Sequence, residues 1–353
     1  MSLHPALSTR LTALVGCRYP IVQTGMGFVA GAPLAAATSA AGGLGILASA
    51  TMTYDELVAA VAEVKRRTDA PFGVNMRADQ ADAAERIDLL ISEGVRVASF
   101  AMAPKQDLIK RAQDGGVLVV PSIGARRHAE KVAAWGVDAV LVQGGEGGGH
   151  TGSVPTSLLL PQVVDAVDIP VIAAGGFFDG RGLVAALAYG AEGIAMGTRF
   201  LLTKDSQVPQ SVKDLYLGKS VNDTVVSVQV DGVPHRVLRS DLVDALESSG
   251  SGQRLMRAMR SGLAYKKLSG TSWAALLKES RAMKATMELS WSQVLMAANT
   301  PIFLRQAMVD GRTDLGVMAS GQVVGLIEDL PTCEELVTRI IEDASRVLKR
   351  LGA

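Results

Sequence analysis

Short apolar runs alternate with stretches of helical periodicity along the first two hundred residues of this chain. Each run is short and mainly apolar and does not alternate between apolar and polar residues, which is typical of strands buried on both faces of a parallel sheet. The runs span Pro20–Thr24, Leu44–Ala48, Phe72–Asn75, Val97–Phe100, Val117–Pro121, Asp138–Gln143, Pro170–Ala174 and Gly193–Met196. Eight such runs predict an α/β fold, a closed (β/α)₈ TIM barrel, with a doubly wound open sheet as the alternative.

The regular spacing ends after Arg199-Phe200, so we expect a smaller, mainly helical segment to be inserted after the eighth strand. The predicted division is a barrel over residues 1–204, a substrate-covering insertion over 205–300, and a C-terminal part over 301–353 that returns to the barrel. Within the insertion, Thr224–Arg239 reads as extended and Ser240–Leu246 as helical. A final helix is predicted over Cys333–Leu348.

Composition excludes several classes of protein. Lys plus Arg and Asp plus Glu each number 35, and this balance favours neither nucleic acid nor an anionic membrane as partner. The N-terminus lacks the apolar core of a secretion signal, and the apolar stretches are too short to span a bilayer. Two distant cysteines predict no disulfide framework, so a cytoplasmic protein is expected. Homo-oligomerisation is left open.

Glycines gather immediately after the predicted strands. The segments are Thr24–Gly27, Ser122–Gly124, Gln143–Gly152, Gly175–Gly180 and Gly197-Thr198. In a barrel these loops share the rim formed by the carboxyl ends of the strands, where active sites lie. The seventh and eighth turns are predicted to bind a phosphate through main-chain amides, and simple tight turns are the alternative.

Other ligand motifs fit poorly. Residues 25–30 match the G-x-G-x-x-A dinucleotide pattern, but no acidic residue stands at 45–50, where the ribose partner is expected. The sequence has neither H-E-x-x-H nor paired cysteines, and it predicts no metal site.

Three motifs together resemble the nitronate monooxygenase (2-nitropropane dioxygenase) family, whose pattern FMN-dependent enoyl-acyl-carrier-protein reductases share. They are Gly148–Gly152, Ile172–Gly176 and Met196–Phe200. Three further segments resemble an actinobacterial branch that includes an FMN-dependent CoA-thioester dehydrogenase of steroid C/D-ring catabolism. These are Val142–His150, Gly175–Gly180 and Trp291–Thr300.

The resemblance implies a barrel that binds FMN and places His150 as the catalytic residue beside the flavin. The implied FMN contacts are Gly25, Met26, Asn75, Gln143, Gly148, Gly175, Gly176, Gly197 and Thr198, with Ser122 as a weaker transfer. The implied reaction converts a fused-ring acyl-CoA to its α,β-unsaturated thioester, with NAD(H) as co-substrate. Nitronate oxidation by oxygen, enoyl-thioester reduction and a non-catalytic phosphate-ligand module are the alternatives.

The chemistry of His150 agrees with that role. A histidine with a pKa near 6.5 suits proton transfer at neutral pH, and the surrounding glycines leave its ring uncrowded. The alternative is a structural histidine at a turn. His4, His128 and His235 are expected at the surface. Glu146 is expected to be a solvated loop carboxylate, with a second acid/base as the alternative.

Basic residues are concentrated in 251–286, a segment that contains eight Lys and Arg residues and a single acidic residue, Glu279. Five are candidates for binding the phosphates of a CoA thioester, because Arg and Lys are the usual partners of phosphate. They are Arg254, Arg257, Arg260, Lys266 and Lys267. The alternative is a solvated basic helix face.

Overall fold

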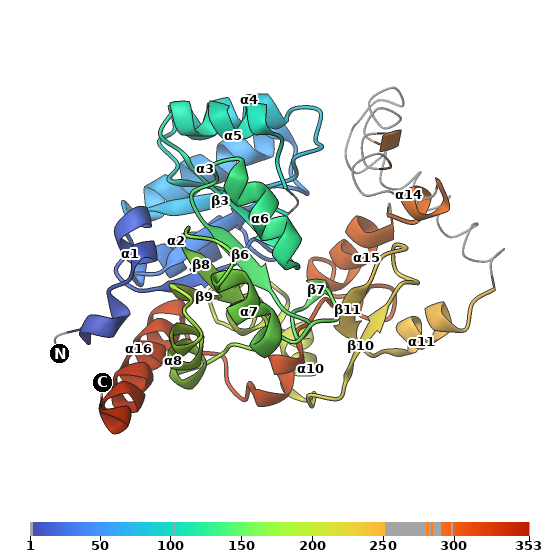
Figure 1. Ribbon diagram of the computed structural model, residues 1–353. Helices are drawn as coiled ribbons and strands as arrows, with labels where there is room; N and C mark the ends of the chain where they lie inside the picture. The colour runs from blue at the N-terminus through green and yellow to red at the C-terminus, as the bar shows by residue number, and fades with distance from the viewer. Residues whose placement is uncertain are drawn as a thin grey trace.

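The computed structural model describes residues 3–101, 103–250, 280–281, 284, 291–297 and 299–352. Within these residues, eight parallel strands close into a barrel (Figure 1). In barrel order they are β1 (Ile21–Gln23), β2 (Leu44–Ala48), β3 (Phe72–Met76), β4 (Val97–Phe100), β5 (Leu118–Ile123), β6 (Val140–Gln143), β8 (Val171–Ala174) and β9 (Gly193–Met196). Because β1 pairs with both β2 and β9, the ring has no free edge, and the predicted barrel is confirmed.

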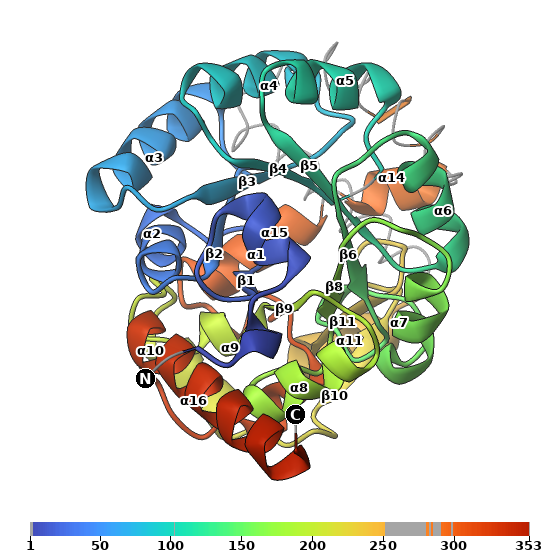
Figure 2. The ribbon, with the colours of Figure 1, turned by 60° about the vertical axis from the view of Figure 1, so that its left-hand side comes forward.

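Helices between the strands form a ring around the barrel (Figure 2). They are α2 (Ala32–Ala40), α3 (Tyr54–Arg67), α4 (Ala83–Ser92), α5 (Gln106–Asp114), α6 (Arg126–Ala134), α7 (Thr156–Val164) and α8 (Gly180–Ala188). The two ends of helix α3 are well marked in the sequence. Thr53 and Glu56 form a capping box at its start, and three basic side chains stabilise its last turn.

The barrel strands bury both faces. Side chains such as Val22 and Ile172 point into the barrel, whereas Leu47 and Val74 belong to the layer that packs against the helices. Helix α1 (Arg10–Val15), which follows the turn η1 (Pro5–Leu7), adds Leu11 to the inner cluster. The amino-terminal end of the barrel is therefore filled, and ligands must enter from the opposite rim.

The chain after β9 returns to that rim. Its elements are α9 (Thr198–Leu201), α10 (Gln210–Leu217), β10 (Thr224–Ser227), β11 (His235–Leu238), α11 (Asp241–Glu247), α14 (Trp291–Ala297), α15 (Asn299–Met308), η2 (Gln322–Leu326) and α16 (Cys333–Leu351). Strand β11 pairs with β7 (Gly149–His150), which lies in the loop between β6 and α7. The inserted segment is thus hydrogen-bonded to a barrel loop, and α16 packs against α8 and α2.

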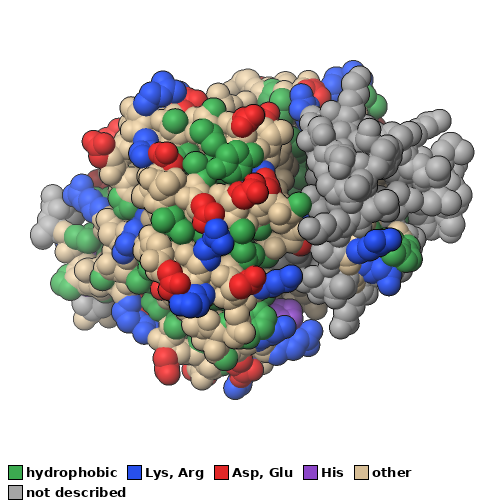
Figure 3. All heavy atoms as spheres, turned by 90° about the horizontal axis from the view of Figure 1, so that it is seen from above, with side chains coloured by type: hydrophobic (Ala, Val, Ile, Leu, Met, Phe, Trp, Pro, Cys, Tyr) green, Lys and Arg blue, Asp and Glu red, His purple; other side chains and the backbone are tan. Residues whose placement is uncertain are grey.

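Acidic and basic side chains are interspersed over the face shown in Figure 3, so this face carries no large field of one sign. In the described part of the chain, no helix is both long enough and apolar enough to cross a membrane. Cys17 and Cys333 are free and buried, as the sequence predicts for a chain without a disulfide framework. Burial raises the pKa of the Cys17 thiol to about 11 and that of Cys333 to about 12.

Candidate functional site

A cavity of about 330 Å³ lies at the carboxyl ends of the barrel strands. Every residue proposed from the sequence as a flavin contact, together with His150, lines it. These residues are Gly25, Met26, Asn75, Ser122, Gln143, Gly148, Gly175, Gly176, Gly197 and Thr198. The fold therefore brings together positions from six strand ends, as expected of a TIM-barrel site. Their roles as ligand contacts remain predictions.

The amide side chains of Asn75 and Gln143 shape this cavity. Gln143 ends β6, and its Nε2 donates to the carbonyl oxygens of His150 (2.9 Å) and Gly148 (3.3 Å). Asn75 lies so close to Gly25 that a Cβ at Gly25 would stand 2.3 Å from the Cβ of Asn75. The hydrogen bonds of Gln143 hold the glycine-rich loop after β6, and Asn75 packs directly against the glycine turn after β1.

Glycine is required at the turn after β8, where Gly175 and Gly176 have φ angles of +96° and +85°. Residues with a Cβ rarely adopt this left-handed backbone. At Gly148, a Cβ would lie 2.5 Å from the main chain of Ser320. The wall is therefore built of main chain at these points, a surface that suits close approach of a phosphate and a planar ring system. The residues present fit a flavin nucleotide.

His150 projects from β7 into the wall of the cavity. Its Nε2 lies 2.6 Å from Oδ2 of Asp231, and its side chain is 55% exposed whereas that of Asp231 is 3% exposed. Because Nε2 is engaged by the carboxylate, Nδ1 is the ring nitrogen left to exchange a proton with a ligand.

Asp231 is held in its ionised form by its neighbours. Burial pushes the pKa of this carboxyl up, but hydrogen bonds and the charges of His150 and His235 together hold it well below its usual range. Thr300 Oγ1 donates to the same Oδ2 at 2.6 Å, and Nδ1 of His235 lies 3.4 Å from it. A fixed carboxylate of this kind orients the imidazole and stabilises its protonated form.

His235 is buried beside His150, and the expectation that it lies at the surface was wrong. Its ring centroid is 4.6 Å from that of His150, because β11 pairs these two residues directly. Its Nε2 has no hydrogen-bond partner among the described residues, and its side chain lines the cavity. Burial lowers the pKa of His235, Asp231 partly opposes this, and the charge of His150 adds to the lowering.

Three residues at the start of α15 and in α14 hold the loop that carries Asp231. Gln293 donates to the carbonyl of Gly232 (2.8 Å), Asn299 to that of Val230 (3.0 Å), and Thr300 to Asp231 itself. The Trp291–Thr300 motif singled out in the sequence thus positions the partner of His150. The sequence identified this motif without indicating its contacts.

Glu146 is half-buried, so its expected solvation was wrong. Its Oε2 accepts hydrogen bonds from the main-chain N–H (2.9 Å) and Oγ1 (2.7 Å) of Thr156, the first residue of α7. The carboxylate therefore stabilises a helix start, and Glu146 also lines the cavity.

Two further interpretations of the sequence concern phosphate binding by basic residues and the absence of a metal site. The basic candidates Arg254, Arg257, Arg260, Lys266 and Lys267 lie outside the described residues. The sequence predicts no metal site, yet ligand atoms of His150, Asp231 and His235 all lie within 4.8 Å of one another. Because Asp231 Oδ2 already accepts from Thr300 and contacts both rings, we interpret the group as an oriented proton-transfer site.

The lowered pKa of His235 predicts a pH-dependent stability. Below about pH 6.5 the unfolded chain binds a proton at this position that the folded chain does not, so the free energy of unfolding falls as the pH falls, by up to about 1.4 kcal/mol per pH unit. Above that pH both states are neutral here, and the Asp231 contribution is lost only below about pH 4. Urea unfolding between pH 5.5 and 7.5 should show a flatter dependence for His235→Gln. Equal slopes in variant and parent would contradict the assignment.

The comparisons with known proteins agree with this geometry. The family described as nitronate monooxygenase matches residues 8–88 and 83–343. This chain belongs to the nitronate monooxygenase family. Membership makes it an oxidoreductase, and a flavin is the cofactor that the family implies.

Two relatives within the nitronate monooxygenase family are similar over nearly their whole length. A protein of Rhodococcus jostii (strain RHA1) is 61% identical over 347 residues, 98% of each chain, and is named "(3aS,4S,5R,7aS)-5-hydroxy-7a-methyl-1-oxo-octahydro-1H-indene-4-carboxyl-CoA dehydrogenase". A protein of Mycobacterium tuberculosis with the same name is 59% identical over 98% of this chain and 99% of its own. Among solved structures, FabK from Thermotoga maritima superposes with a TM-score of 0.81 at 32% identity, over 98% of both chains.

Proposed function

We propose that this chain is an FMN-dependent dehydrogenase that oxidises a fused-ring acyl-CoA to its α,β-unsaturated thioester, with NAD(H) as the second substrate. The observation that carries the proposal is the His150–Asp231 pair on the wall of a cavity lined by glycines. The substrate class is that named for relatives 59–61% identical over almost the whole chain.

The glycine-lined turns are the proposed binding site for FMN. Gly175 and Gly176 follow β8, and Gly197 and Thr198 follow β9, so the terminal phosphate would meet main chain from two neighbouring strand ends. Gly25, Met26, Asn75, Ser122, Gln143 and Gly148 would border the rest of the cofactor.

The proton chemistry falls to His150. Its Nδ1 removes the α-proton that the thioester carbonyl acidifies, and Asp231 stabilises the resulting imidazolium through Nε2. Bound flavin supplies the acceptor for the hydride that leaves the β-carbon. Loss of a proton from Cα and a hydride from Cβ leaves the C=C bond, so atoms and electrons balance.

The same pair argues against nitronate oxidation as the main activity. A nitronate is already deprotonated at the reacting carbon, so its oxidation has little use for an imidazole that a buried carboxylate orients for proton removal. An enoyl-thioester reductase would use the same groups in reverse, with the imidazolium as proton donor.

Anaerobic flavin reduction by a panel of ligands tests the proposal. We expect saturated or hydroxylated fused-ring acyl-CoAs to bleach the flavin absorbance of the purified, flavin-loaded protein, and NAD⁺ to reoxidise the flavin. Bleaching by nitronates with no response to any acyl-CoA would overturn the proposal. Bleaching by NAD(P)H followed by reoxidation with enoyl-CoA alone would assign the reductive direction.

A further inference from the structure

A second, larger cavity opens beside the glycine-lined cavity. It has a volume of about 640 Å³ and is lined mainly by the loops after β1, β2 and β3 and by α15. Val29 lines both cavities, so the two meet across the loop between β1 and α2. None of the residues assigned above to FMN or to proton transfer lines the second cavity.

Helix α15 forms part of the wall of both cavities. Thr300, Leu304 and Met308 line the glycine-lined cavity, and Pro301, Arg305 and Val309, each one position later, line the second. Residues four apart share one face of a helix, so two adjacent stripes of α15, continued by Val309, face two adjacent chambers. A ligand that occupies both chambers would contact the same helix throughout.

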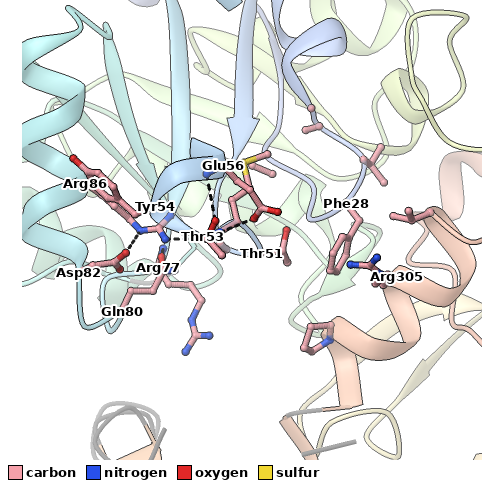
Figure 4. A pocket seen from close by; sticks show the side chains of 18 of the residues that line it. Phe28, Thr51, Thr53, Tyr54, Glu56, Arg77, Gln80, Asp82, Arg86 and Arg305 are labelled. Atoms are coloured by element: carbon pink, nitrogen blue, oxygen red, sulfur yellow. Dashed lines mark hydrogen bonds and ion pairs between the residues drawn. The ribbon is translucent and has the colours of Figure 1, made fainter. Parts of the chain in front are cut away.

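The second cavity combines a cation with polar and apolar walls. Arg305 has no ionic partner among the described residues, and it lines the cavity together with Phe28 (Figure 4). Thr51 and Gln80 offer hydroxyl and amide groups on the other side. The remaining cations are already engaged within the described residues, as the next contacts show.

Arg77 forms two hydrogen bonds with the buried carboxylate of Asp79, at 2.9 and 2.7 Å. Arg86 is buried and bonded to Asp82 and to the carbonyls of Ser49 and Met52. Glu56 also lines this cavity, but its Oε2 accepts the main-chain N–H of Thr53 at 2.8 Å. Arg305 is therefore the cation of the cavity that has no ionic partner among the described residues.

We infer that the second cavity binds the phosphate-bearing pantetheine arm of the acyl-CoA, with Arg305 contacting its phosphates. The inference rests on the proposed function. The acyl carbons must reach His150 in the first chamber, and the long arm must then leave past Val29. Hydroxyl and amide side chains suit the amides of pantetheine, and an arginine suits a diphosphate.

The test compares two thioesters of the same acyl group, one on CoA and one on pantetheine without phosphates. Arg305→Ala removes the cation, and Val309→Glu adds an anion on the same stripe. Each is expected to raise KM for the CoA thioester about tenfold and to leave KM for the pantetheine thioester within about twofold, because only the first carries phosphates. Arg312→Ala is the matched control, since Arg312 is exposed, pairs with Asp314 and lines neither cavity.

The outcomes separate this inference from the proposed function. If the parent oxidises both thioesters and Arg305→Ala has the same KM as the parent for each of them, the second cavity does not bind the pantetheine arm. A change confined to KM for NAD⁺ would assign the cavity to the dinucleotide and overturn the inference. If the parent oxidises neither thioester, the proposed function itself fails. Circular dichroism and melting of both variants would show that each is folded.

Discussion

His150→Ala is expected to keep its flavin but to reduce it with acyl-CoA about 10²–10⁴-fold more slowly, the usual contribution of a positioned general base. Nδ1 of His150 is the ring nitrogen left free by the Asp231 contact. His235 also lines the cavity, but burial lowers its pKa, so it is the weaker base of the two. Stopped-flow absorbance under anaerobic conditions measures the rate, and the flavin spectrum of the resting protein measures retention.

Two variants make this prediction specific. His128→Ala replaces an exposed histidine of α6 and should reduce flavin at the parent rate. Added imidazole should partly restore the His150→Ala rate, which a purely structural role would not allow. Unchanged flavin reduction in His150→Ala would remove this residue from the mechanism.

Asp231 is expected to act through His150 as a positioning residue. Asp231→Asn keeps a hydrogen-bonding group of the same size but lacks the charge that stabilises the imidazolium, so kcat should fall while KM for the acyl-CoA changes little. An equal loss in kcat and flavin content would indicate a structural role instead.

Gly176→Val is expected to weaken FMN binding by about 10- to 100-fold. A β-branched residue at φ +85° is strained by about 1–3 kcal/mol, and relief of that strain would move the main chain that we assign to the phosphate. Titration of the apoprotein with FMN, followed by fluorescence quenching, measures the dissociation constant.

Gly124→Ala is the matched control for that experiment. Gly124 also follows a barrel strand, but its φ is not left-handed and the nearest atom to an added Cβ is 3.9 Å away. It should bind FMN as the parent does. A full flavin complement in Gly176→Val at low FMN concentration would refute the phosphate assignment at the turn after β8.

The barrel and the glycine-lined cavity were predictable because their signals are local. Each buried parallel strand is a short, mainly apolar run, and most rim turns show glycines in the few residues that follow. Asp231 and His235 were not predictable in the same way. They lie 81 and 85 positions from His150 and reach it only through the pairing of two-residue strand β7 with β11.

The basic candidates of 251–286 lie outside the described residues, so their role in phosphate binding stays a prediction. A cluster of basic residues in 251–286 is conspicuous in the sequence, whereas Arg305 is a single arginine on an amphipathic helix. The role that we propose for Arg305 depends on which face of α15 lines which cavity, and helix periodicity alone does not reveal that.

The pairing of β7 with β11 has a consequence for how such enzymes can change over time. The hairpin that carries the carboxylate partner lies in the inserted segment, and its loop is held by Asn299 and Thr300 at the start of α15, the helix bordering both chambers. Substitutions that reshape these elements for a new acyl group should therefore also disturb the alignment of His150, the proton acceptor that we propose. Ligand preference and proton chemistry should diversify together, and grafting the segment between relatives should succeed only when Gly149–His150 is transferred with it.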